Sequence, residues 1–124
     1  MKVNELKIGD WVYNTNNRQP EQVCEIREHM VMLDYNDLYD YVEIEPIPLS
    51  AEILEQNGLE KKDHRYGIYD DYSDFEIYEY NDGTWLVSYH CCEMSLSDEQ
   101  LLICYVHQLQ HFVRHCGIEK EIEL

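Results

Sequence analysis

The sequence predicts an α+β fold in a single domain spanning residues 1–124, and three observations support this class. Short alternating segments separated by turn residues fill residues 1–48, which indicates a small SH3-like antiparallel β subdomain. In residues 49–124, a short helix is followed by two alternating runs around a tight turn, which indicates a β-hairpin. An apolar stripe at helical spacing near the C-terminus indicates a long amphipathic helix packed on the sheet.

The N-terminal part is expected to contain four short strands. Alternation of apolar and polar side chains places them at residues 10–13, 21–27, 30–35 and 41–44. The first two strands flank a polar turn, Asn14-Thr15-Asn16-Asn17. Pro46 and Pro48 lack the N–H group that an interior strand must donate, so this β-rich part ends before them.

A short helix is expected to begin after Ser50, whose hydroxyl can cap it. Leu49 and Leu54 occupy the two positions of a hydrophobic staple at the helix start. Gly58 can adopt the left-handed conformation that ends a helix, and Leu59 can then return onto Leu54. The helix is therefore bounded at both ends by local signals.

A β-hairpin is expected from residues 75–80 and 84–89, which alternate around Asn81-Asp82-Gly83. This turn predicts a three-residue loop with the glycine at positive φ. One face of the hairpin is expected to be apolar, formed by Phe75, Ile77, Trp85, Val87 and Tyr89. Residues 64–69 are expected to add a third strand.

The C-terminal helix is expected to begin with a capping box from Ser97 to Gln100 and to end at Gly117, with Ile118 returning onto Val113. Leu96 and Leu101 fit a staple at its start. Its apolar stripe covers about 140° of the helix. The stripe consists of Leu101, Leu102, Tyr105, Val106, Leu109, Phe112, Val113 and Cys116. Residues 119–124 are expected either to pair as an edge strand or to remain irregular.

The charge balance restricts the class of partner. The chain has 9 Lys and Arg against 26 Asp and Glu, a formal net charge of −17. Direct binding to nucleic acid or to an anionic membrane needs clustered basic side chains, so neither is expected. No apolar run reaches the roughly 18 residues of a membrane span, and the N-terminus lacks the apolar core of a signal peptide. We therefore expect a cytoplasmic protein, with no prediction of its oligomeric state.

The five cysteines are odd in number and include no Cys-x-x-Cys pair, which favours reduced thiols. His107, His111 and His115 follow one another at four-residue spacing, with Cys104 on nearly the same line. Such a stripe can bind zinc or nickel, but Gln-Leu-Gln separates the first two histidines where a zinc protease has its glutamate. Because the stripe lies opposite the apolar face, we expect a solvated or partner-facing surface, with no metal or cofactor. His90-Cys91-Cys92 would share a metal site with this stripe only if the stripe turned inward.

No phosphate-binding glycine loop and no GxSxG nucleophile motif is present, so an enzyme is not expected. The eleven tyrosines exceed what one small core can bury, and tyrosines flanked by acids suit protein interfaces. The candidates for such an interface are Tyr66, Tyr69, Tyr72, Tyr78 and Tyr80. The first hypothesis is therefore an acidic module that binds a protein partner. The alternatives are a nucleic-acid mimic that inhibits a DNA- or RNA-binding protein, and a module that binds a small ligand or a metal.

Three segments together resemble a family of small uncharacterised proteins from Bacteroides-type genomes, their prophages and mobile elements. The segments are ELKIGDWVY near the N-terminus, EIEPIPLSAEILEQNGLEK in the middle and YVHQLQ in the expected C-terminal helix. The resemblance covers most of the chain in register. It implies a phage or mobile-element context and carries no catalytic residue or ligand to this sequence.

Overall fold

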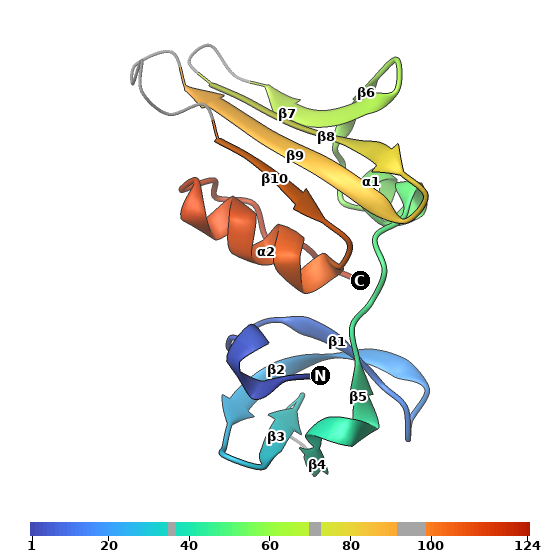
Figure 1. Ribbon diagram of the computed structural model, residues 1–124, viewed down its shortest axis with the longest axis vertical. Helices are drawn as coiled ribbons and strands as arrows, with labels where there is room; N and C mark the ends of the chain where they lie inside the picture. The colour runs from blue at the N-terminus through green and yellow to red at the C-terminus, as the bar shows by residue number, and fades with distance from the viewer. Residues whose placement is uncertain (35–36, 70–72, 92–98) are drawn as a thin grey trace.

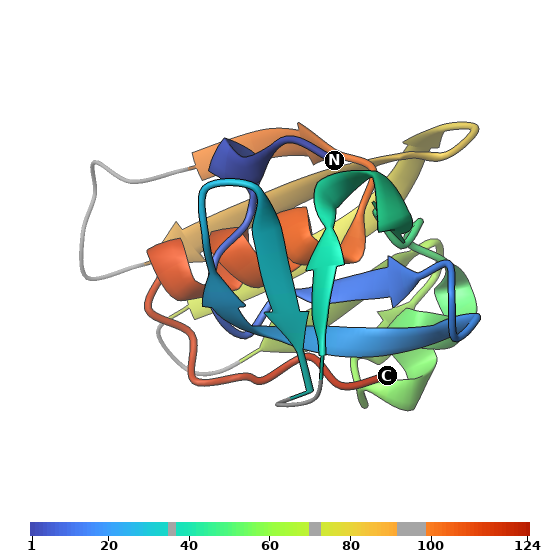
Figure 2. The ribbon, with the colours of Figure 1, turned by 90° about the horizontal axis from the view of Figure 1, so that it is seen from below.

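The computed structural model describes residues 1–34, 37–69, 73–91 and 99–124. They form two five-stranded antiparallel sheets, with helix α2 (Val106–His115) lying between the sheets (Figure 1). The view from below shows α2 behind the strands of the first sheet (Figure 2). The α+β class is confirmed, with more strand than helix. No helix in the described ranges is long and apolar enough to cross a membrane.

The first sheet follows a short 3-10 turn, η1 (Val3–Glu5), and has the strand order β4-β3-β2-β1-β5. Its strands are β1 (Trp11–Asn14), β2 (Gln19–Ile26), β3 (Met30–Leu33), β4 (Leu38–Asp40) and β5 (Ile44–Glu45). The predicted polar turn joins β1 to β2. Asn14 Oδ1 stabilises this turn by accepting the backbone N–H groups of Asn16 and Asn17 at 2.9 and 3.3 Å. Of the predicted strand 30–35, Tyr35 lies outside the described residues.

A buried carboxylate supports this turn. Glu21 accepts hydrogen bonds from the side-chain amides of Asn14, Asn17 and Gln19. Burial alone would raise the pKa of Glu21, but the three amide donors outweigh it and the pKa is lowered. The asparagine-rich turn therefore serves both the backbone and a buried charge.

The predicted strand at residues 41–44 is wrong for residues 41–43, and only Ile44 lies in a strand, β5. Tyr41–Glu43 forms a 3-10 turn, η2, and β4 precedes it. Asp40 caps the turn by accepting the Val42 N–H at 3.2 Å, and Glu43 accepts the Asp40 N–H at 2.9 Å. Asp at the start of a short turn and an acid three residues later form a capping box, which here outweighs the strand preference of Tyr41 and Val42.

The second sheet has the order β10-β9-β8-β7-β6. Its strands are β6 (Glu60–Lys62), β7 (Arg65–Tyr69), β8 (Ser73–Asn81), β9 (Thr84–Cys91) and β10 (Glu99–Ile103). Helix α1 (Ala51–Gln56) precedes it and has the predicted ends. The Ser50 hydroxyl accepts the Ile53 N–H at 3.3 Å, and the Leu59 N–H returns to the Leu54 carbonyl at 3.2 Å past Gly58 at φ +76°.

The hairpin of β8 and β9 confirms the predicted pairing and its faces. Phe75 pairs with Tyr89 and Ile77 with Val87, and their side chains point toward α2. Asn81 pairs with Thr84 after a register shift, so the loop is shorter than expected, and Gly83 has φ +78°. Strand β7 is the predicted third strand, which pairs with β8.

The C-terminal helix begins later than expected. Residues 99–103 form β10, in which Leu101 pairs with Val87 and Leu102 with Leu86. The proposed start at Leu96 and Ser97 lies outside the described residues. A short apolar run fits a strand as well as a helix, and pairing with β9 decides between them. These two leucines are therefore not part of the helix stripe.

Helix α2 has a different start from the predicted one and the predicted end. At its start, Gln108 Oε1 accepts the backbone N–H groups of Cys104 and Tyr105 at 2.8 and 3.1 Å. At its end, Gly117 has φ +73° and the Ile118 N–H donates to the Val113 carbonyl at 3.0 Å. The end is thus the predicted Schellman motif.

Two apolar cores lie on either side of α2. The first sheet encloses one core, built from residues such as Val12, Val23 and Leu33. The second core lies between the second sheet and the two α-helices. Helix α2 contributes Val106, Leu109, Phe112 and Val113 to this second core. The opposite face of α2 is polar and turns toward the first sheet.

Candidate functional site

The histidine stripe does not face solvent as expected. His107 is only 3% exposed, and His111 is partly buried. Both side chains lie on the face of α2 that meets the first sheet. Helix α2 has an apolar face and a polar face, and the polar face is covered as well, because the first sheet lies over it. The expectation of a solvated or partner-facing stripe is therefore wrong for these two residues.

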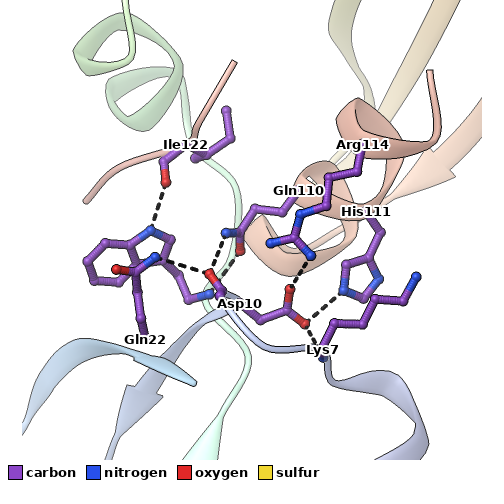
Figure 3. A network of polar contacts seen from close by, with 9 residues as sticks. Lys7, Asp10, Gln22, Gln110, His111, Arg114 and Ile122 are labelled. Atoms are coloured by element: carbon purple, nitrogen blue, oxygen red, sulfur yellow. Dashed lines mark hydrogen bonds and ion pairs between the residues drawn. The ribbon is translucent and has the colours of Figure 1, made fainter. Parts of the chain in front are cut away.

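Asp10 is the centre of this polar contact (Figure 3). Its carboxylate is completely buried and reaches three groups. Oδ2 accepts the Lys7 N–H at 2.8 Å and lies 2.7 Å from His111 Nε2, while Oδ1 lies 3.9 Å from a terminal nitrogen of Arg114. Two side chains of α2, His111 and Arg114, therefore converge on one buried acid of the loop before β1.

Gln110 adds a second connection beside Asp10 (Figure 3). Its Oε1 accepts the Trp11 N–H at 2.9 Å, and its Nε2 donates to the Gly9 carbonyl at 2.9 Å. The side chain thus pairs with the backbone of the first sheet much as a neighbouring strand would. We refer to Asp10, Trp11, Gln110, His111 and Arg114 as the joint.

His107 is buried next to the joint. Its ring stacks on Tyr105 at 5.9 Å between centroids and meets the His111 ring edge-on at 5.7 Å. Burial lowers the pKa of His107, and the opposing attraction of Asp10 does not compensate. Its Nδ1 is buried with no hydrogen-bond partner among the described residues. The ring is therefore neutral near pH 7 and acts chiefly in packing.

The remaining candidates for a metal site do not join these two histidines. Cys104 precedes the helix and its Sγ lies 3.8 Å from Thr84 Oγ1. His115 is exposed in the last turn of α2, and Cys92 of the second group lies outside the described residues. In the described ranges, no three His, Cys, Asp or Glu side chains are grouped to hold a metal ion. Cys24, Cys104 and Cys116 form no disulfide.

The candidate tyrosines separate into different environments. Tyr66 is buried in the second core, with its hydroxyl 3.3 Å from a Glu55 carboxylate oxygen, so its proposed interface role is wrong. The alternation of β7 turns this residue toward the helices. Tyr72 lies outside the described residues. Tyr69 and Tyr78 lie on the side of the second sheet turned away from α2, which we call the open face, and Tyr80 is exposed at the register shift near the end of β8.

Tyr69 is fixed on the open face by its neighbours. Its hydroxyl donates to Glu76 at 3.1 Å, and Lys62 Nζ lies 3.9 Å from the ring centroid. Burial, and then the bond to Glu76, raise the pKa of Tyr69 to about 12. The ring also covers Gly67, where a Cβ atom would lie 2.6 Å from the ring and 2.5 Å from the Phe75 carbonyl oxygen. Gly67 therefore permits this packing.

An apolar row crosses the open face beside Arg65 of β7. By register, Tyr78 pairs with Leu86 and Leu86 pairs with Leu102, so these three side chains lie side by side on three strands. Leu102 is 51% exposed, and the Arg65 guanidinium lies 5.1 Å from the Tyr78 ring centroid. Tyr80 is also exposed, at the register shift after Glu79. The sequence does not predict this row, because its apolar spacing assigns Leu102 to the C-terminal helix instead of to a strand.

A groove of about 700 Å³ lies beside the joint, under the C-terminal residues. Trp11, Gln110 and Arg114 line one side of it. The tail is held there by Ile122, which is buried and whose carbonyl accepts the Trp11 indole N–H at 2.7 Å. Residues 119–124 form no edge strand. They are irregular, and the contacts of Ile122 hold them against Trp11 of the first sheet.

Comparison of the chain with protein-family models, with curated proteins and with solved structures finds no match.

Proposed function

We propose that this chain is a non-enzymatic module that binds a protein partner through the open face of its second sheet. The apolar row of Tyr78, Leu86 and Leu102 carries this proposal. A sheet side that is covered by no other element in the described ranges, and that still places apolar side chains together, is typical of an interaction surface.

The charge around the row indicates the nature of the partner. On the open face, Glu76 lies two residues from Tyr78 and is paired with Arg65 at 3.5 Å, so the preference for a basic partner comes from the net charge of −17 on the whole chain. Complementary charge speeds encounter and excludes partners of like charge. A basic protein is therefore the partner that this surface favours.

The alternative of a nucleic-acid mimic requires carboxylates arrayed along one face. The exposed acids instead lie on β4, α1, β6 and the end of the β8–β9 hairpin, from the foot of the first sheet to the far edge of the second (Figure 1). This scatter favours the general binding module over the mimic. The groove beside the joint is the feature that supports a small-ligand module, the other alternative.

We also propose that the first sheet is an SH3-like barrel of phage or mobile-element origin. The support for the barrel is its order, in which a four-strand meander is followed by a 3-10 turn and β5 returns to pair with β1. The support for the origin is the three sequence segments quoted above. Since fold does not determine function, the binding proposal rests on the open face alone.

The test is affinity capture from a Bacteroides-type host lysate with three forms of the protein. Wild type is compared with Leu86→Gln, which makes the centre of the row polar, and with Val42→Gln at an apolar residue on η2 that is 83% exposed. We expect a basic protein that wild type and Val42→Gln retain, that Leu86→Gln loses, and that high salt releases. Equal recovery by the two variants, with both folded by circular dichroism, would contradict the proposal.

A further inference from the structure

The two edges of the second sheet differ sharply. Edge strand β6 has only charged residues, Glu60, Lys61 and Lys62, all exposed. Charged edge strands, especially those with lysine, discourage pairing with another chain. Edge strand β10 instead presents Leu101 and Leu102, which are 50% and 51% exposed. One edge is therefore protected and the other is apolar.

Strand β10 is also open on its outer side. It pairs with β9 through residues 99–103, and no other strand in the described ranges pairs with it. A five-residue edge strand of this kind has a row of N–H and C=O groups with which an extended segment of another chain can form backbone hydrogen bonds. The residues after β10 are already paired in this way, because Leu49 N–H donates to the Cys104 carbonyl and Val106 N–H to the Ile47 carbonyl.

We propose that β10 accepts an extended, cationic segment of the protein partner as a sixth strand of the second sheet. This inference rests on the proposed function and adds to it the binding mode and the chemistry of the segment. The open face supplies the apolar contact, and the edge of β10 supplies the backbone hydrogen bonds.

Charge selects a cationic segment over a second copy of this chain. Residues 66–113, which run from the second residue of β7 through β10, contain nine acids and no Lys or Arg, whereas Arg65 at the start of β7 is paired with Glu76 at 3.5 Å. Antiparallel pairing of β10 with its own copy would bring two bodies of net charge −17 together at this edge. A strand that contains lysine or arginine would instead be attracted by the net negative charge of this chain.

The pleat of β10 determines the side-chain pattern of the segment. Leu102 points to the open face beside Leu86, whereas Leu101 points to the side of α2 beside Val87. Successive residues of an added strand also alternate between these sides. The segment therefore fits best with apolar residues beside the row of the open face and basic residues between them.

The experiment uses a short synthetic peptide in which lysine and valine alternate, titrated into the full-length protein. Calorimetry measures its affinity, and amide hydrogen exchange measures protection at residues 99–103. We expect binding that weakens with salt and protection of alternate amides of β10. A peptide in which glutamate replaces lysine should not bind.

Two variants and one modified peptide locate the contact. Leu101→Lys adds a charge at the edge without touching the open face and should weaken binding at least about tenfold, whereas Val42→Lys should change it less than about twofold. Methylation of alternate peptide nitrogens should abolish binding in one of the two possible patterns. Equal affinity for both methylation patterns, or no effect of Leu101→Lys, would overturn the inference.

The outcomes separate this inference from the proposed function. Binding that Leu86→Gln removes and that both methylated peptides retain would preserve the open face as the site and exclude strand addition. A dimer of the protein alone, detected by sedimentation and lost in Leu101→Lys, would mean that a second copy occupies the edge and would overturn the cationic partner.

Discussion

Asp10 is the residue on which the contact between the two sheets depends most. It is completely buried, and His111 Nε2 lies 2.7 Å from its Oδ2. A buried carboxylate that loses a partner bears its desolvation cost without compensation. The joint therefore gives His111 a structural role that its four-residue spacing from His107 did not reveal.

We expect His111→Ala to destabilise the protein by about 1–3 kcal/mol, because the substitution leaves Asp10 short of a donor. If His111 faced solvent, the same substitution would change the free energy of unfolding by no more than about 0.5 kcal/mol. The control is His29→Ala, whose side chain is 84% exposed and should be nearly neutral. Urea unfolding of both variants measures the difference, and equal midpoints would contradict the role of the joint.

The neutral ring of His107 makes stability depend on pH. Its pKa is lowered by burial from the ordinary value of 6.5, so below about pH 6.5 the unfolded chain binds a proton that the native chain does not. The contribution of His107 is therefore complete above this pH and is lost as the pH falls. We expect His107→Leu to reduce the loss of stability between about pH 7.5 and pH 5.5. In the control, His29→Leu should leave the loss unchanged.

At the scale of elements, helix α2 shows what the sequence could predict and what it could not. Val106, Leu109, Phe112 and Val113 keep the spacing of a packed face, and the structure buries all four. The covering of the opposite face could not be predicted, because a stripe of His and Gln reads as solvated until another element is known to lie on it. Strand β10 could not be predicted either, because Leu101 and Leu102 fit the spacing of a helix as well as that of a strand.

Leu109→Ala tests the packed face of α2. Leu109 is completely buried in the second core, so truncation should leave a cavity and cost about 2–5 kcal/mol. The matched control is Leu102→Ala, since Leu102 is half exposed on β10 and should cost less than about 1 kcal/mol. Urea melts of the two variants decide, and a silent Leu109→Ala would mean that α2 is not a core element.

A side chain of the connection after α1 also holds the C-terminal tail. Asn57 Nδ2 donates to the Glu123 carbonyl at 2.9 Å, and its Oδ1 accepts the Glu123 N–H at 2.7 Å. We expect Asn57→Ala to release the tail and to raise the hydrogen-exchange rate of the Glu123 amide, with a loss of about 1–2 kcal/mol. Gln56→Ala, at an exposed position of α1, is the control and should change neither quantity.

At the scale of the whole molecule, α2 joins two sheets that have separate cores. Its apolar side closes the second core, and its polar side meets Asp10 and Trp11 of the first sheet. This arrangement covers one side of the second sheet and leaves the open face and the β10 edge for a partner. The two sheets are therefore expected to unfold together as one unit.

The two tryptophans allow this central claim to be measured directly, because each lies in a different sheet. Trp11 is in β1 at the joint, and Trp85 is buried in the second core. Trp85→Phe leaves Trp11 as the fluorescent reporter of the joint, where Trp11 also packs against the second core, and Trp11→Phe leaves Trp85 as the reporter of the second core. The account predicts that in each variant the urea transition seen by fluorescence coincides with that seen by far-ultraviolet circular dichroism. A Trp11 transition that precedes unfolding of the remaining structure would contradict it, because the first sheet would then separate from α2 before the second core unfolds.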